Sequence, residues 1–532
     1  MDLENANAIP PPPPLPVPLA PPATQAMDTE AAALSSPRAR DADGAVDAIT
    51  PALGRLMSKR EFPGGERSAL SVRWDANVQD DDDEDFVVAR ECKRRDECKA
   101  TPTAIRTLKA AGGGGARIIY SAAGLDHLTG EGHQESPKRL RVLLDALRES
   151  PDAPFTETTF RAPLSDVLRV HDFDYVKHLR STVAAAPAEA PKQATPGACL
   201  DSDTRVSPGS LEAALAGCGA ALVAVDAVCG GKSRAVLVVA RPPGHHAGPR
   251  GAVPTDAHFW KSPEMCSCGF CLLNTAAVAA GYARYAYGRD DSRGPPVRRV
   301  AIVDFDVHHG NGTEACVRNL APRRARLPLP PSWPPQYYDA YAPWLDETDP
   351  AETFFGSVHL FAADGSFYPG SGSGDDDDEN IVNVPLSPVG PCRPGDAPAR
   401  HALGDKQRDA CKAKASAEFR AAVDAKLLPK LAAFRPDLLI FSAGFDGHEK
   451  DLYHFLSDDD YAWFTTACLD ATRGSAGGRA VSILEGGYSV DPPPPKRGRR
   501  SNKNKEEPPP DLTGGLVDGA TAHLKALAAF DP

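Results

Sequence analysis

VDFDVHHGNGT, residues Val303–Thr313, closes an apolar run that begins at Val300. Such a run predicts a buried strand, in which residues i, i+2 and i+4 lie on one face. Asp304, Asp306 and His308 are therefore expected to share a face at the strand end. Two carboxylates and an imidazole form a mixed oxygen and nitrogen ligand set that suits Zn²⁺ or a similar first-row metal. The stretch predicts a metal site at the end of a buried strand.

Three other apolar segments also run into polar, Gly-rich turns. They are Ala235–Ala240 before RPPGHH, Leu438–Phe441 before SAGFDGH, and Ala480–Leu484 before EGGY. Helix-like stretches lie at Ser210–Val228, Thr275–Tyr287, Ser416–Phe434 and Asp458–Ala471. Uniformly apolar strands that alternate with helices predict an α/β fold, with a mostly parallel central sheet and helices on both faces.

The predicted strands also place their following residues in space. Ligands of an open parallel sheet bind beyond the carboxyl ends of its strands. His245, His246, Asp446 and Tyr488 follow predicted strands, so they are expected to converge with the residues of the first stretch. Together these side chains predict the site of a mononuclear metal hydrolase.

Five motifs resemble, in order, those of the zinc-dependent histone deacetylase superfamily. They are RPPGHHA, GFCLLN, VDFDVHHGNGT, SAGFDGH and LEGGYS. The likeness is greatest to the class II-like branch and extends from about 116 to 530. It implies a three-layer fold of the arginase/deacetylase type. The implied activity is that of a Zn²⁺-dependent amidohydrolase that removes acetyl groups from lysine side chains.

The resemblance also implies which residues carry the reaction. Asp306, His308 and Asp446 would bind one Zn²⁺ ion and leave a position open for water and the substrate carbonyl. His245 and His246 would form the general base and acid pair. The chemistry of these residue types supports both assignments.

Further residues would support this centre. Asp304 would orient His245, and Asn311 would be the partner of His246. Tyr488 would donate a hydrogen bond to the developing oxyanion. Asp304 and Ser357 also match a structural K⁺ site of the family.

The substrate channel is expected to be narrow and apolar. Phe270 and Tyr368 would flank the methylene stem of acetyl-lysine, with Gly269 in the same wall. Asp203 either contacts the substrate backbone at the rim, as an acidic residue does in relatives, or forms an Asx-turn or cap before the helix at Ser210.

Several functions stay open at this point. The pocket chemistry would be the same in a deacetylase of small acetylated amines such as polyamines. An acetyl-lysine binding module without turnover is a further alternative, although the intact set of metal ligands with Tyr488 disfavours it. A binuclear manganese ureohydrolase would need additional Asp and His ligands, which Phe305, Val307 and Phe445 do not supply.

Composition limits the partners. The net charge of −13 argues against tight nonspecific binding to nucleic acid, and no direct sequence-specific nucleic-acid binding is expected. The expected partner is an acetylated protein, such as a histone tail or another Lys-rich substrate, with a corepressor complex as a further option. The acidic run Asp375–Glu379 either attracts such substrates or is a solvated loop.

The chain divides into two parts by composition. Residues 1–115 contain a Pro tract, an acidic run and a Gly run, and predict a largely disordered region. Residues 116–532 predict one catalytic domain, with insertions at about 248–268, 318–353 and 491–510.

The same composition bears on the compartment. No secretory signal and no apolar run long enough to span a membrane are apparent, and the twelve cysteines are scattered, so a nuclear or cytoplasmic protein is expected. The basic cluster Lys496–Lys505 is either a nuclear import signal or a solvated loop.

Overall fold

The structure is a computed structural model that describes residues 115–148, 153–187, 199–254, 266–290, 294–326, 333–334, 336–374, 377–391, 396–490 and 514–532. The predicted disordered region, apart from Gly115, lies outside the described residues. So do the predicted insertion 491–510 with its basic cluster, and Asp375 and Asp376 of the acidic run.

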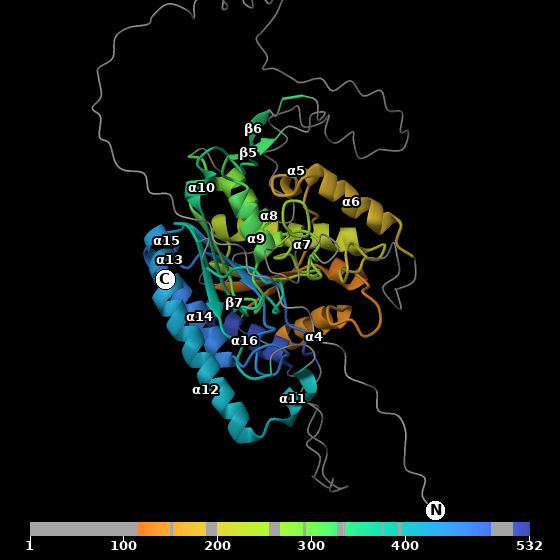
Figure 1. Cartoon of the computed structure of the whole chain (residues 1–532). Coiled ribbons are helices and arrows are strands. Elements are labelled where there is room, and N and C mark those ends of the chain that lie inside the picture. The colour runs from red at the N-terminus through yellow and green to blue at the C-terminus, as the bar shows by residue number, and fades with distance from the viewer. Residues whose placement is uncertain are drawn as a thin grey trace, which may run out of the picture. The chain divides into compact units, whose positions relative to one another are not determined.

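A single parallel sheet organises the catalytic part of the chain (Figure 1). Its eight strands follow the order β2 (Phe155–Glu157), β1 (Ala116–Tyr120), β3 (Ala235–Val239), β10 (Ala480–Leu484), β9 (Leu438–Ala443), β4 (Val300–Asp304), β7 (Thr353–Leu360) and β8 (Ile381–Leu386). Every neighbouring pair in it is parallel. The predicted α/β class is confirmed.

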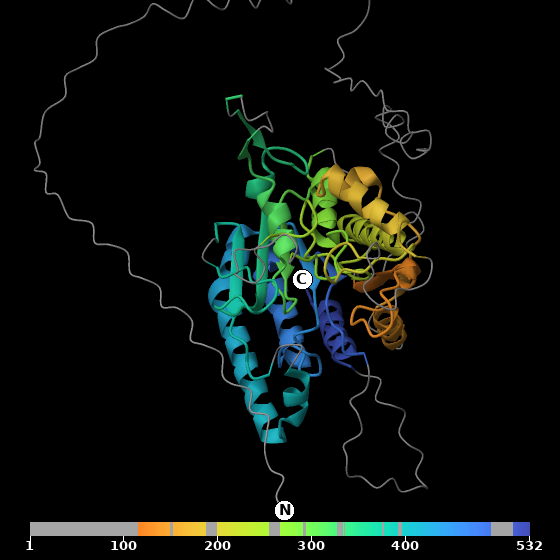
Figure 2. The ribbon, with the colours of Figure 1, turned by 45° about the vertical axis from the view of Figure 1, so that its right-hand side comes forward.

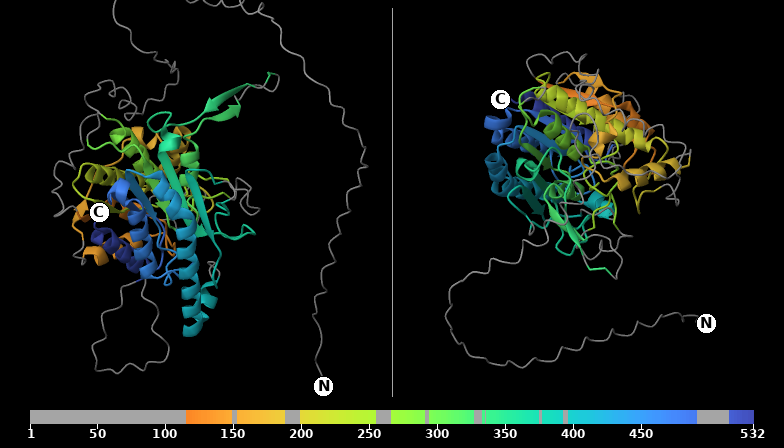
Figure 3. Two further views of the ribbon diagram at one scale, coloured as in Figure 1. Left: turned by 90° about the vertical axis from the view of Figure 1, so that its left-hand side faces the viewer. Right: turned by 90° about the horizontal axis from the view of Figure 1, so that it is seen from above.

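Helices cover both faces of this sheet, and Figures 1 and 3 show the two layers on opposite sides. One layer contains α5 (Leu164–Val167), α6 (Phe173–Ala184), α7 (Ser210–Cys229), α8 (Thr275–Tyr287) and α9 (Asn311–Arg318). The other contains α4 (Pro137–Arg148), α12 (Asp405–Ala422), α13 (Leu428–Phe434), α14 (Asp458–Ala471) and α16 (Gly515–Ala529). Each layer forms its own buried core against the strands.

In the described part of the chain, four shorter helices lie in the connections between the main elements. They are η3 (Ala122–Asp126), α10 (Asp349–Glu352), α11 (Ala397–Ala402) and α15 (Arg473–Ala476). The predicted helix Ser416–Phe434 was too short, because α12 begins eleven positions earlier and continues through the π-helical turn η6 (Val423–Leu427) into α13. The charged first half of α12 has no apolar stripe, which is why the periodicity did not reveal it.

Strand β4 ends earlier than the sequence predicted. Val300 and Ile302 face one core and Ala301 and Val303 the other, but the strand stops at Asp304. Beyond this point, the side chains of Asp304 and Asp306 accept hydrogen bonds from the backbone. The Asp304 carboxylate accepts the amide of Asp306 at 3.0 Å, and the Asp306 carboxylate accepts the amide of His308 at 2.9 Å. These Asx-type contacts draw the chain out of the extended conformation, so a common strand face for 304, 306 and 308 was wrong.

The predicted insertion 318–353 carries an antiparallel hairpin, β5 (Arg323–Arg326) and β6 (Tyr337–Ala340). Figures 2 and 3 show the hairpin projecting from the layered part of the catalytic unit. Tyr337 and Tyr338 on it are exposed. The two strands pair with each other and with no strand of the main sheet among the described residues.

Helix α7 differs from one expectation. By length and composition it could cross a membrane, although no segment of this kind was predicted. In the structure it is almost entirely buried, and it packs against the sheet and against its neighbour α8. A core helix of this layer needs the same apolar composition.

Candidate active site

The three predicted metal ligands lie together beyond the carboxyl ends of β4 and β9. His308 Nδ1 lies 2.9 Å from Asp446 Oδ2 and 3.1 Å from Asp306 Oδ1. Backbone amides hold both carboxylates, since Gly486 N–H donates to Asp306 at 2.8 Å and Val307 N–H donates to Asp446 at 3.0 Å. All three ligand side chains are buried.

This donor set fits a metal ion. Apart from the approach of His308, the buried Asp446 Oδ2 has no polar partner among the described residues. Burial and the charge of Asp306 raise the pKa of Asp446 to about 7. Two buried carboxylates at such close range are unfavourable unless a cation lies between them. Oxygen and imidazole donors suit a first-row divalent ion.

Two histidines follow β3 and stand beside this cluster. His245 Nδ1 donates to Asp304 Oδ2 at 2.9 Å, and His246 Nδ1 donates to Asn311 Oδ1 at 2.7 Å. The structure thus brings each predicted partner to its histidine. With Nδ1 donating in both rings, the Nε2 atoms are left for chemistry, and His245 Nε2 lies 3.8 Å from Asp306 Oδ1.

The surroundings shift the pKa values of the two histidines in opposite directions. Burial lowers the pKa of His245, but the charges of Asp306 and Asp304 outweigh it and raise that pKa to about 10. Burial, with the charges of His245 and His308, holds the pKa of His246 well below its usual value. A pair with opposite shifts suits an acid and a base.

A cavity of about 380 Å³ opens onto this centre. Its lining residues are Gln134, Asp203, His246, Gly269, Phe270, His308, Ser366, Phe367, Tyr368, Tyr453 and Tyr488. Every residue predicted to bind substrate is among them. The Phe270 ring packs edge-on against Tyr488 at 5.9 Å, and the Tyr368 ring packs edge-on against His246 at 4.9 Å.

The comparisons with known proteins agree with this geometry. A family model described as Histone deacetylase domain matches residues 133–493. The chain belongs to the histone deacetylase family. The crystal structure of the HDA15 HD domain shares its fold, with a TM-score of 0.53 and 24% identity over 78% of this chain and 89% of that chain.

Relatives of this histone deacetylase-type chain come from several kingdoms. An uncharacterized protein of Synechocystis sp. is 32% identical, over 70% of this chain and 93% of that protein. The histone deacetylase-like amidohydrolase of Pseudomonas aeruginosa is 30% identical, over 67% of this chain and 73% of that protein. Histone deacetylase 10, chloroplastic, of Oryza sativa is 27% identical, over 71% of this chain and 70% of that protein. Family membership makes the chain a hydrolase of the deacetylase and amidohydrolase type.

Two readings of Asp203 were open, and the structure rejects one of them. The first residue of α7 is preceded by Gly209, and no side chain caps that helix. The Asx-turn belongs to Asp201, whose Oδ1 accepts the amides of Asp203 at 3.2 Å and Thr204 at 2.9 Å. Asp203 instead lies at the pocket rim.

Four pocket residues were not predicted as site residues: Gln134, Ser366, Phe367 and Tyr453. Phe367 stacks on His308 at 5.4 Å, and Tyr453 packs edge-on against the same ring at 4.7 Å. The Tyr453 hydroxyl donates to Gln134 Oε1 at 3.3 Å, across 319 positions of sequence. Only Phe367 had a signal, because it directly precedes the predicted channel residue Tyr368.

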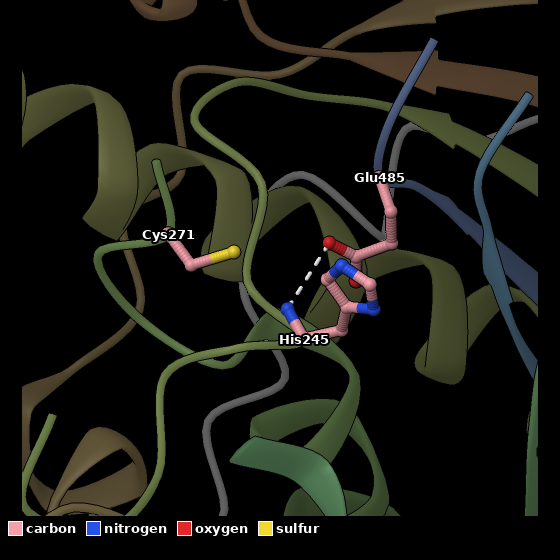
Figure 4. Close-up of side chains that lie close together, drawn as sticks. All are labelled: His245, Cys271 and Glu485. Carbon is pink, nitrogen blue, oxygen red and sulfur yellow. Dashed lines mark hydrogen bonds between the residues drawn. The ribbon is translucent and has the colours of Figure 1, made fainter. Parts of the chain in front are cut away.

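A second group of possible ligands consists of His245, Cys271 and Glu485, which lie close together (Figure 4). Its donor atoms are already engaged. Glu485 Oε2 accepts the amides of Gly244 at 2.6 Å and His245 at 3.2 Å. Burial raises the pKa of the Cys271 thiol well above its usual value. This group is therefore a hydrogen-bonded support for the histidine loop rather than a metal site.

The two residues of the predicted K⁺ site lie on neighbouring strands. Ser357 on β7 is the register partner of Asp304 on β4. The Ser357 hydroxyl lies 2.9 Å from His359 Nδ1, so a side-chain contact already engages it. Potassium binding stays a prediction.

Proposed function

We propose that this protein is a Zn²⁺-dependent deacetylase that hydrolyses Nε-acetyl-lysine in histones or other proteins. The observation that carries the proposal is the buried cluster Asp306, His308 and Asp446 beside a pocket of about 380 Å³, which is lined by His308, His246 and Tyr488. When bound there, Zn²⁺ would polarise the acyl carbonyl and lower the pKa of water.

The protein's own residues would handle the protons. His246 lines the pocket and has a lowered pKa, so its Nε2 is suited to take the proton of the attacking water. His245 donates a hydrogen bond to Asp304, and the charges of Asp306 and Asp304 raise its pKa, so it would stabilise negative charge in the transition state. The amine of the leaving lysine receives its proton from the same histidine pair.

Tyr488 would donate a hydrogen bond to the oxyanion that develops from the substrate carbonyl. Its ring packs against the Phe270 edge, and its backbone amide donates to Asp451 Oδ2 at 2.8 Å. The guanidinium of Arg139 lies 5.0 Å from the ring centre. A phenol anchored on two sides is preorganised to donate a hydrogen bond to the oxyanion.

The pocket favours a lysine stem over a polyamine. Of the described lining residues, Asp203 is the one acid, and it stands at the exposed rim. A polyamine carries a secondary ammonium group along its stem, and such a charge is costly in a channel without a carboxylate partner. The methylenes of lysine carry no such cost.

The test is a panel of acetyl-lysine histone peptides, an acetyl-tubulin peptide and acetylspermidine, assayed with the Zn²⁺-loaded wild type and Tyr488→Phe. We expect turnover of the peptides, and a loss of about 10²–10³ in kcat for Tyr488→Phe, because one oxyanion donor is removed. Activity confined to acetylspermidine would establish the polyamine alternative. Hydroxamate binding without any turnover would establish an acetyl-lysine reader.

A further inference from the structure

A chain of hydrogen bonds links the wall of the pocket to its rim. The Tyr368 hydroxyl donates to the backbone carbonyl of Ser267 at 2.8 Å. The Ser267 hydroxyl in turn donates to Asp203 Oδ1. Three segments that are far apart in sequence, around 203, 267 and 368, are thereby joined at one side of the pocket.

The Ser267 hydroxyl is committed to Asp203. It also lies 3.4 Å from Asp201 Oδ1, but a hydroxyl has a single proton and the contact with Asp203 is much shorter. Its lone pair accepts the amide of Gly269 at 2.8 Å. Ser267 therefore connects the rim carboxylate to the glycine that precedes Phe270 in the channel wall.

Asp201 serves as a separate scaffold for the same loop. Its Oδ2 accepts the amide of Cys268 at 2.7 Å, in addition to the Asx-turn contacts of Oδ1. Thr204 Oγ1 donates to Asp203 Oδ1 at 3.3 Å and accepts the amide of Phe270 at 3.2 Å. With the turn fixed by Asp201, the Asp203 carboxylate accepts hydrogen bonds from the hydroxyls of Ser267 and Thr204.

We propose that Tyr368 and Ser267 are positioning residues that hold the Asp203 carboxylate at the rim for the backbone amides of a polypeptide substrate. This inference rests on the proposed function. The role belongs to the hydroxyl of Tyr368, since a phenylalanine would keep the aromatic wall but would not hold Ser267. The substrate class that follows is an acetylated segment of extended chain, whose free N–H groups are the donors that a rim carboxylate accepts.

The hydroxyl of Tyr368 therefore affects peptide binding through Asp203, and not through contact with the methylene stem of acetyl-lysine. An uncharged acetylated stem without peptide N–H groups offers Asp203 no donors. Loss of the Tyr368 hydroxyl should then appear mainly as a higher KM for peptides. The effect should vanish when Asp203 is absent.

A double-mutant cycle on one acetyl-lysine peptide tests this inference. The proteins are the Zn²⁺-loaded full chain as wild type, Tyr368→Phe, Asp203→Ala and the double variant. We expect Tyr368→Phe to lower kcat/KM about three- to tenfold, the effect of one lost hydrogen bond, and less than twofold in the Asp203→Ala background. Ser267→Ala should behave as Tyr368→Phe does.

Tyr285→Phe is the matched control, because Tyr285 is an exposed residue of α8 outside the pocket. It should leave kcat/KM within twofold. Equal losses from Tyr368→Phe in both backgrounds would overturn the inference, and so would no loss in either. If the wild type does not turn the peptide over, the proposed function fails, and the same cycle is then read from peptide dissociation constants.

Discussion

At the scale of the residue, glycines make room for the carboxylates of the metal cluster. A Cβ on Gly444 or Gly486 would overlap Asp306 Oδ2. A Cβ on Gly486 would also overlap Asp446 Oδ2. The glycines of the SAGFDGH and LEGGYS motifs are therefore required by close approach of the backbone to the ligands. This requirement explains why these strand ends contain glycine beside acids.

Gly444→Ala should consequently weaken metal binding. The added methyl group displaces the Asp306 carboxylate, so we expect the dissociation constant for Zn²⁺ to rise at least tenfold in a competition titration against a chelating dye. Gly474→Ala is the control, because a Cβ there meets no atom within 4 Å. Equal affinities of the two variants would show that the ligand loop adapts to the methyl group.

Glu485 stabilises the loop that carries His245 and His246. It is fully buried, and its carboxylate holds the amides of Gly244 and His245. Glu485→Leu would leave two buried N–H groups without an acceptor, at a cost of about 1–3 kcal/mol each in the free energy of unfolding. Glu485→Gln keeps an acceptor oxygen and should retain most of that stability. Urea denaturation of both variants measures the difference, and equal losses would mean that the negative charge, not the acceptor, matters.

At the scale of the element, the β5–β6 hairpin stands apart from the core. Its strands pair with each other, and Trp344, which follows the hairpin, is buried against α8 near Gly281. Replacing Arg323–Ala340 with a short Gly-Ser linker should change the free energy of unfolding by about 1 kcal/mol or less, because loop closure depends weakly on length. Turnover of an acetyl-lysine peptide should persist. A large loss of stability would show that the hairpin packs on the catalytic layers.

The four predicted strands, β3, β4, β9 and β10, were predictable because each is buried on both faces. Ala480–Leu484 was predicted with both bounds as observed, and so were helices Thr275–Tyr287 and Asp458–Ala471. The end of β4 was not predictable from alternation, since side-chain contacts of Asp304 and Asp306 with nearby amides compete with the strand.

At the scale of the whole molecule, metal binding should stabilise the fold. The ligands come from segments after β4 and β9, and the unfolded chain does not hold them together. A ligand that binds only the folded state at a hundred times its dissociation constant adds about 2.7 kcal/mol. We expect the Tm of the chelator-treated protein to rise when Zn²⁺ is added. Asp446→Asn should abolish most of this rise, and an undiminished rise in that variant would place the stabilising ion elsewhere.

By itself, the sequence determined the fold class, the family and the acidic and histidine side chains that come together beyond the strand ends. Each of these depends on local patterns, such as apolar strands that end in Asp, His and Gly. Because the carboxyl ends of parallel strands lie at the same edge of the sheet, the residues that follow them come close together. Only the tertiary structure decided that Tyr453 meets Gln134, that Asp201 rather than Asp203 forms the turn, and that Tyr368 reaches Ser267. These contacts depend on how loops from distant segments pack over the sheet, and no periodicity of the chain encodes that packing.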